Sequence, residues 1–167
     1  SVVDLLNILH AFSDKLTLSA FEFFSDLALQ KVQAHRKLPA PLANRVDNYA
    51  LLEFDESELA KAEEAFALCM EEGWLVDGVI SQSQAQAAAL WQLREGISES
   101  LAPYTPYKND LSVRISEVPG FLADVDRYVN EGYPDFEVCW YGHIGDGNLH
   151  LNILRPESLS LEEFFHV

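Results

Sequence analysis

The sequence has few basic residues, few cysteines and no long apolar segment. Lysine and arginine number 11 against 27 acidic residues, a formal net charge of −16 over 167 residues. A field of that sign repels phosphate backbones and anionic lipid, which disfavours binding to nucleic acid or to a membrane surface. No apolar run approaches the roughly 20 residues that cross a bilayer, and no signal-peptide pattern follows Ser1. These absences favour a soluble cytoplasmic protein.

Cysteine is equally scarce. The two thiols, Cys69 and Cys139, lie far apart in apolar stretches. Buried free thiols in a reducing cytosol are the expected state. The length suits one domain with a proper core, and a homodimer is left open.

Strand-like and helix-like patterns alternate along the chain. Strands are predicted at 16–24, 49–54, 75–80, 110–115, 136–143 and 148–155. Helices are predicted at 26–36, between Asp55 and Gly73, at 82–100, and after a cap at Ser116. A proline-containing loop is expected at 38–48. This order favours an α+β fold, a mainly antiparallel sheet with helices packed on one face.

The last residues begin a helix. Ser160 and Glu163 form a capping-box pattern, followed by Phe164 and Phe165. A helix of under two turns is marginal unless it is packed. We therefore expect the natural polypeptide to continue beyond Val167, and the opening at Ser1 rather than Met suggests an earlier start as well.

The segment from Trp140 to Arg155 holds the most chemical information. Asp146-Gly147 is a favoured hairpin turn. A two-residue loop there would place His143 opposite His150, with Cβ atoms about 4.5–5.5 Å apart, so both imidazoles could reach one metal ion. A catalytic zinc usually has three protein ligands. Since no third ligand is evident nearby, it is expected from outside this chain.

Alternation places Asn148, His150 and Asn152 on one face of the second strand, with leucine and isoleucine on the other. The polar row fits a functional face, and it equally fits the solvated face of an open sheet. The row also faintly resembles the histidine-triad nucleotide hydrolases. In this chain asparagine replaces two of their histidines, and the acidic charge disfavours a nucleotide.

Basic residues reappear after a long gap. None occurs between Lys61 and Arg94, after which Lys108 and Arg114 follow. Arg94, with Ser98 one turn later, could bind a carboxylate. The alternative is a set of surface ion pairs, such as Arg94 with Glu99 or Lys108 with Asp110.

Four segments together resemble a known family. They are LSAFEFF at 18–24, WQLREGIS at 91–98, YKNDLS at 107–112 and GHIGDGNLHLN at 142–152. They resemble the C-terminal domain of FAD-linked oxidases, the ferredoxin-like cap domain of vanillyl-alcohol-oxidase-type flavoproteins, over essentially the whole chain. Within that family the motifs are most similar to those of dehydrogenases that act on D-2-hydroxyglutarate, and next to those acting on D-lactate or glycolate.

The resemblance implies roles for individual residues. His143 and His150 would bind zinc or another divalent metal, and Asn152 would contact the substrate near it. The substrate carboxylates would be held by Arg94, Ser98 and Lys108. Glu22 matches a family position without an assigned role, no catalytic residue is assigned within this chain, and Arg114 stands where the family usually has proline.

The implied activity belongs to a longer enzyme. Residues 1–167 would be its substrate- and metal-binding C-terminal domain, with FAD held mainly by an N-terminal domain that this chain lacks, together with an extreme C-terminal segment. The reaction would be oxidation of a D-2-hydroxy acid, of the 2-hydroxyglutarate or the lactate and glycolate class, to the 2-oxo acid. The chain alone should be inactive, and its electron acceptor is undefined. The alternative is a non-catalytic α+β binding or assembly domain.

Overall fold

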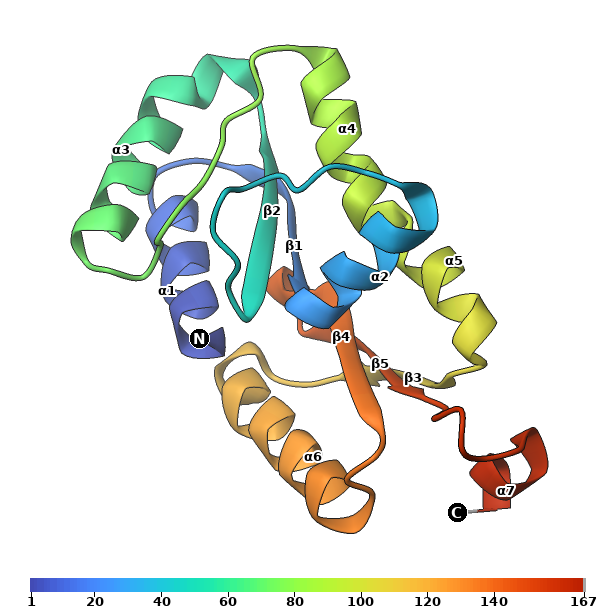
Figure 1. Ribbon diagram of the computed structural model, residues 1–167. Helices are drawn as coiled ribbons and strands as arrows, with labels where there is room; N and C mark the ends of the chain where they lie inside the picture. The colour runs from blue at the N-terminus through green and yellow to red at the C-terminus, as the bar shows by residue number, and fades with distance from the viewer. Residues whose placement is uncertain (167) are drawn as a thin grey trace.

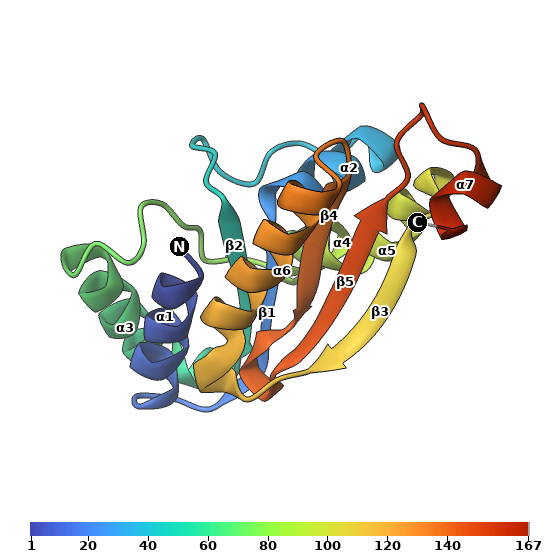
Figure 2. The same ribbon diagram turned by 90° about the horizontal axis from the view of Figure 1, so that it is seen from below.

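One antiparallel sheet organises the molecule (Figures 1 and 2). The computed structural model describes residues 1–166. Within them, five strands lie side by side in the order β2 (Asn48–Phe54), β1 (Leu18–Ser25), β4 (Glu137–His143), β5 (Asn148–Leu154) and β3 (Tyr107–Ser112). Each neighbouring pair is antiparallel. The predicted α+β class and antiparallel sheet are confirmed.

Helices cover both faces of this sheet, whereas the sequence favoured one. Their bounds are α1 (Val2–Ser13), α2 (Asp26–Arg36), α3 (Leu59–Glu71), α4 (Gln84–Glu95), α5 (Ile97–Leu101), α6 (Val118–Gly132) and α7 (Leu161–His166). Figure 1 shows α1, α3 and α6 on one side and α2, α4 and α5 on the other. Both faces of the sheet are apolar. Phe21 and Phe23 pack in the core on the side of α1 and α3, and Phe24 packs in the core on the side of α2 and α5. A sheet with two apolar faces must be covered twice.

Local signals explain several boundaries. The Ser25 hydroxyl accepts from the backbone N–H of Ala28 and begins α2, whose predicted range agrees with the structure. The predicted single helix at 82–100 divides at Gly96 into α4 and α5. The capping box at Ser160 and Glu163 is present in both directions, so that prediction is confirmed. Among the described residues, no helix is long and apolar enough to cross a bilayer.

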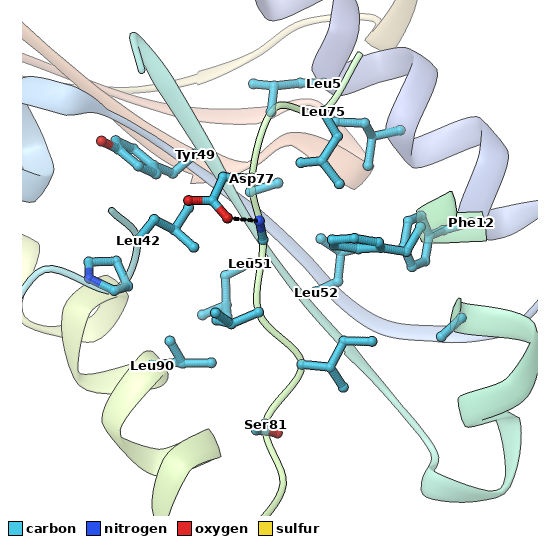
Figure 3. A pocket seen from close by; sticks show the side chains of 18 of the residues that line it. Leu5, Phe12, Leu42, Tyr49, Leu51, Leu52, Leu75, Asp77, Ser81 and Leu90 are labelled. Carbon is cyan, nitrogen blue, oxygen red and sulfur yellow. Dashed lines mark hydrogen bonds between the residues drawn. The ribbon is translucent and has the colours of Figure 1, made fainter. Parts of the chain in front are cut away.

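The predicted cap at Ser116 is wrong, because Glu117 stands at the N-cap of α6 and makes no side-chain cap hydrogen bond. Two further predictions of secondary structure are wrong. The N-terminal helix α1 is missing from the predicted elements, although Leu5, Ile8 and Phe12 are buried at helical spacing. The predicted strand at 75–80 is irregular, with no ladder partner in the structure. β propensity needs a neighbouring strand to be realised. This stretch instead crosses in front of β2 (Figure 3) and walls a cavity.

That cavity has a volume of about 870 Å³ and lies among β2, α1 and the irregular segment. Its labelled wall is mostly aliphatic and aromatic, including Leu5, Phe12, Leu52 and Leu75 (Figure 3). The carboxylate of Asp77 points toward it, but its oxygen already accepts from the Gly78 N–H at 2.8 Å. We call this hollow the apolar cavity.

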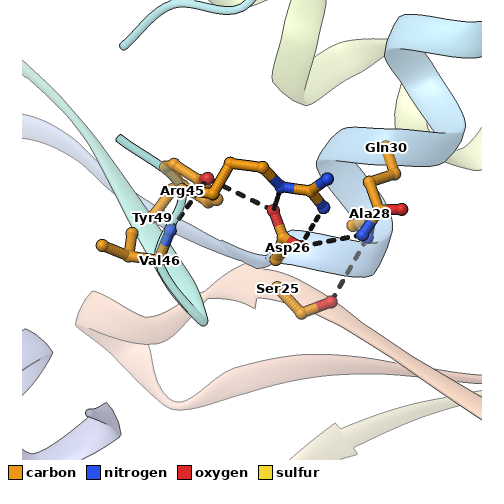
Figure 4. Close-up of polar contacts among 7 residues, drawn as sticks. All are labelled: Ser25, Asp26, Ala28, Gln30, Arg45, Val46 and Tyr49. Carbon is orange, nitrogen blue, oxygen red and sulfur yellow. Dashed lines mark hydrogen bonds and ion pairs between the residues drawn. The ribbon is translucent and has the colours of Figure 1, made fainter. Parts of the chain in front are cut away.

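A polar cluster fastens the predicted loop at 38–48 to the start of α2 (Figure 4). The Asp26 carboxylate accepts from Arg45, from Gln30 at 2.8 Å and from the Tyr49 hydroxyl at 3.2 Å. Burial alone would raise the pKa of Asp26, but the hydrogen bonds, led by that from Arg45, together hold its pKa below the usual value. The loop is therefore tied down by a charged group.

Candidate active site

The two hairpin histidines lie on one face of the sheet, in a register that differs from the prediction. His143 pairs with Asn148, and His150 pairs with Tyr141. The prediction that His143 is opposite His150 is therefore wrong by two residues. Because side chains alternate with a period of two, both rings still point to the same face. Their centroids are 5.6 Å apart.

A longer loop causes the shift. Residues Ile144–Asp146 form a 3-10 turn, and Gly147 follows with φ 75°. The Gly147 carbonyl accepts from the Val113 N–H at 2.9 Å, which ties the loop to the chain leaving β3. Asp146 accepts from the Asn148 N–H at 3.0 Å, so its side chain stabilises the turn through the backbone. The contact with β3, which is remote in sequence, selects this loop over the two-residue turn.

The histidines open into a pocket of about 520 Å³ between the sheet and the helices α4 and α5. We call it the polar pocket. It is lined by Glu22, Trp91, Arg94, Glu95, Ser98, Lys108, Asp110, Tyr141, His143 and His150. The structure thus brings Arg94, Ser98 and Lys108 to the same face as His150, as the sequence indicated.

Asn152 lies beneath this pocket and does not line it. Its side chain is 1% exposed, with Lys108 and Cys139 as cross-strand neighbours. The amide nitrogen donates to the His150 carbonyl at 3.4 Å, while within residues 1–166 the amide oxygen has no hydrogen-bond partner. A buried acceptor without a partner costs stability, and since Asn152 does not line the pocket, the predicted contact of Asn152 with the substrate is not formed in this arrangement. Burial raises the pKa of the Cys139 thiol to about 12, which keeps it protonated and unsuited as a thiolate ligand.

Glu22 is the central charged group that the sequence left without a role. It is 4% exposed on β1. Its Oε2 accepts from Arg94 Nε at 2.9 Å, with Arg94 Nη2 also at 2.9 Å, and its Oε1 lies 2.5 Å from His143 Nδ1. Arg94 therefore pairs with a buried carboxylate rather than with Glu99 at the surface.

His150 has a carboxylate partner of its own. Asp110 Oδ1 lies 2.5 Å from His150 Nδ1, so Asp110 pairs with the histidine rather than with Lys108. An ionised carboxylate accepts hydrogen bonds and does not donate them. The proton in each histidine–carboxylate contact therefore belongs to Nδ1, and neither Nε2 atom is used by that contact.

This arrangement suits metal binding in part. Metal-bound histidines commonly give their other ring N–H to a carboxylate, as both histidines do here. Within residues 1–166, however, no group of three or more His, Cys, Asp or Glu side chains is arranged to hold a metal ion. The described donor set is thus two imidazoles, short of the three protein ligands of a catalytic zinc.

The charge of the pocket differs from expectation. An anionic substrate predicts a local excess of positive charge, yet Arg94 and Lys108 share the pocket with three carboxylates, Glu22, Glu95 and Asp110. Arg94 also lies over the Tyr141 ring, 4.9 Å from its centroid. Arg114 is exposed after β3 and is not among the lining residues. Additional positive charge would be needed to hold a dianion firmly.

Sequence reasoning missed Glu22, Asp110 and Tyr141 as members of this site. Glu22 carries a usable signal, because it is the single charge in the otherwise apolar run LSAFEFF. Asp110 could be placed only through its register opposite His150. Tyr141 required the register of the hairpin, which the turn prediction misassigned.

Comparison with known proteins decides the family. The model of the FAD linked oxidases, C-terminal domain, matches residues 1–165. The chain belongs to this family.

Several of the similar proteins are named D-2-hydroxyglutarate dehydrogenase. The chain is 54% identical over 164 residues to a D-2-hydroxyglutarate dehydrogenase of Stutzerimonas stutzeri, covering 96% of this chain and 35% of that protein. It is 55% identical over 163 residues to the enzyme of that name from Xanthomonas citri pv. viticola, covering 96% and 34%. A mitochondrial D-2-hydroxyglutarate dehydrogenase of Arabidopsis thaliana is 38% identical over 146 residues, covering 84% and 26%. The chain spans about a third of the length of these two bacterial relatives.

Proposed function

We propose that this chain is the substrate-binding domain of an FAD-dependent dehydrogenase that oxidises a D-2-hydroxy acid to the 2-oxo acid. Its substrate would be 2-hydroxyglutarate, with the lactate and glycolate class as the second choice. The convergence of Arg94, Ser98 and Lys108 with two histidines in one pocket is the observation that carries the proposal. Family membership and the names of the relatives support it.

Substrate recognition would rest on the cations from two elements. Arg94 comes from α4 and Lys108 from β3, so the two can contact separate carboxylates of a dianion. Arg94 pairs with Glu22 through Nε and Nη2. The N–H groups of Nη1 and the second N–H of Nη2 remain for a bidentate contact with a substrate carboxylate at the end of the guanidinium. Ser98, exposed on the next helical turn, can add a hydroxyl donor.

His143 and His150 would hold a divalent metal through Nε2, with Glu22 and Asp110 behind them. A metal there would supply positive charge to a pocket in which carboxylates outnumber cations, and would favour loss of the substrate hydroxyl proton. Zinc is the metal proposed from the family resemblance. Further ligands must come from outside the described donor set.

The flavin site itself does not fit the described residues. Phosphate cradles rely on open backbone, often at glycines of positive φ. Among the described glycines, Gly73, Gly142 and Gly147 have positive φ. A Cβ at Gly142 or Gly147 would lie within 2.5 Å of another carbonyl oxygen, so packing already fills these two positions, and Gly73 is open but stands alone at the rim of the apolar cavity. We therefore assign this chain to binding and orienting the hydroxy acid, and place the flavin in another domain. On that assignment the chain alone is inactive.

The main alternative is a non-catalytic α+β binding or assembly domain. A buried ion pair, two histidine–carboxylate pairs and an orphaned amide oxygen on one face argue against an incidental polar surface. A cytoplasmic location is also proposed, supported by two buried free thiols. A homodimer is a separate proposal, which sedimentation analysis would test.

The test is turnover by the full-length protein with an artificial electron acceptor. D-2-hydroxyglutarate should be oxidised with a higher kcat/KM than D-lactate or glycolate, and a chelator should lower the rate while added zinc restores it. If the flavin is bleached without any preference for a hydroxy acid, the protein is still a flavoprotein, but the proposed substrate is wrong. Absence of both bound flavin and turnover would favour the binding-domain alternative.

A further inference from the structure

We propose that Glu22 is a positioning residue that holds Arg94 and His143 in the geometry that substrate and metal require. The inference rests on the proposed function, in which Arg94 binds a carboxylate and His143 a metal. Glu22 is 4% exposed within an apolar strand, and each of its oxygens has one partner. One carboxylate thereby links the substrate cation to the metal histidine.

For His143 the contact fixes the tautomer. Glu22 Oε1 lies 2.5 Å from Nδ1, and a carboxylate only accepts, so the ring carries its proton at Nδ1. The lone pair of the neutral ring then lies at Nε2. The His143 side chain is 46% exposed and would otherwise be free to rotate, so Glu22 also sets the direction in which Nε2 points.

For Arg94 the contact fixes the guanidinium plane. Nε and Nη2 approach the same oxygen of Glu22, and the guanidinium carbon lies over the Tyr141 ring, 4.9 Å from its centroid. The end-on donors are therefore presented in one orientation. A preoriented guanidinium loses less entropy when it binds a carboxylate.

A purely structural role explains this arrangement less well. Glu22 is flanked by Phe21 and Phe23, and a buried ion pair is often no more stabilising than apolar residues of similar volume. The distinguishing chemical feature is the number of acceptors. A glutamine at position 22 has the same shape, but an amide NH2 replaces one of the two oxygens and would face either Arg94 or His143, donor against donor.

The experiment compares Glu22→Gln with Glu95→Gln. Glu95 lines the same pocket and is exposed, so its substitution removes one negative charge from the same surroundings. Three readouts are used: zinc affinity of the full-length protein by chelator competition, histidine tautomers from 15N-labelled protein, and KM for the dicarboxylate. Single His→Gln variants assign the His143 signals.

Wild-type protein should show His143 protonated at Nδ1. Glu22→Gln should weaken zinc binding about 10- to 100-fold and raise KM for the dicarboxylate, whereas Glu95→Gln should change zinc affinity less than about threefold. Glu22→Asp keeps charge and both acceptors, so it should recover part of the affinity and serves if Glu22→Gln does not fold.

Three results would overturn the proposal: an Nε2-protonated His143 in the wild type, equal zinc affinities of the two glutamine variants, or no recovery in Glu22→Asp. If wild-type protein does not bind zinc, the metal part of the proposed function fails. The His143 tautomer and the KM of Glu22→Gln then still decide the role of Glu22.

Discussion

The two hollows of this molecule differ in how they are built. The apolar cavity is the larger, about 870 Å³ against about 520 Å³, and its walls include the irregular segment that follows α3. The polar pocket is formed by side chains from strands β1, β3, β4 and β5 and helices α4 and α5. Regular elements fix side-chain positions better than loops do. The smaller hollow therefore has the more defined chemistry.

Trp91 lies between the two hollows and lines both of them. Its indole N–H donates to Glu53 on β2 at 2.8 Å. On the polar side, ionisable groups converge within ordinary hydrogen-bonding distance of each other. On the apolar side, the wall is mainly aliphatic (Figure 3). Volume alone would favour the apolar cavity, whereas convergent polar groups favour the polar pocket as the binding site.

The largest expected difference concerns Arg94. Arg94→Ala would leave the carboxylate of Glu22 buried without its cation, and breaking a buried pair costs about 3–5 kcal/mol of unfolding free energy. Urea denaturation measures the loss. Arg36→Ala, which breaks a partly exposed pair with Glu99, is the matched control and should lose far less. Equal losses would mean that Glu22 is not effectively buried.

Two glycines in the left-handed region offer the next comparison. Gly147 has φ +75° in the hairpin of the polar pocket, and Gly73 has φ +73° at the rim of the apolar cavity. Alanine strains both by about 1–2 kcal/mol. At Gly147 the added Cβ would also lie 2.0 Å from the Val113 carbonyl oxygen, while at Gly73 nothing lies within 4 Å.

Gly147→Ala should therefore lower the thermal midpoint clearly more than Gly73→Ala. It should also shift the NMR signals of His143 and His150, since the loop must move away from β3. Similar midpoints for the two variants would show that the contact between the hairpin and Val113 is looser than described.

A wall residue of the apolar cavity should matter for stability alone. Leu75 is half-buried, and Leu75→Ala should cost about 1 kcal/mol of unfolding free energy. The KM for hydroxy acid should not change, because Leu75 lies outside the polar pocket. A rise in KM comparable with that of a polar-pocket variant would link the two hollows and weaken the distinction between them.

The smallest expected effect is acid-dependent and comes from Asp26. The pKa of Asp26 is lowered in the folded state. Its contribution to the free energy of unfolding is therefore present above the unfolded pKa of about 3.9 and is lost as pH falls through the lower folded pKa. Asp26→Asn should therefore reduce stability at neutral pH, and the gap to wild type should close below about pH 4. Urea denaturation at several pH values measures it. A gap that is constant with pH would contradict this origin.

The fold was largely predictable because its signals are local. Caps such as Asp55 and the alternation of β4 and β5 place most elements close to their observed ranges. The segment 75–80 failed because its β-forming residues have no paired neighbour, which is a tertiary condition. The patterns of the single strands also did not predict that helices cover the second face of the sheet.

The lining of the polar pocket was predictable only in part, because it also includes Asp110 and Tyr141 and lacks Asn152. His143, His150, Arg94 and Lys108 share a pocket because period-two alternation and helix spacing survive a register error of two residues. The acceptor behind His143 was not foreseen, because Glu22 lies 121 residues away in sequence. Pairing across such a distance is set by strand order, which local patterns do not encode.

The most direct test of the central claim is calorimetric titration of the full-length protein with 2-oxoglutarate, the proposed product, and with pyruvate. Lys108→Ala should weaken binding of the dicarboxylate about 10- to 150-fold, the equivalent of one charge-assisted hydrogen bond, and should affect pyruvate much less. Lys61→Ala, a lysine on α3 outside both hollows, is the control and should bind both ligands as the wild type does. If Lys108→Ala binds 2-oxoglutarate as tightly as Lys61→Ala, the polar pocket is not the dicarboxylate site.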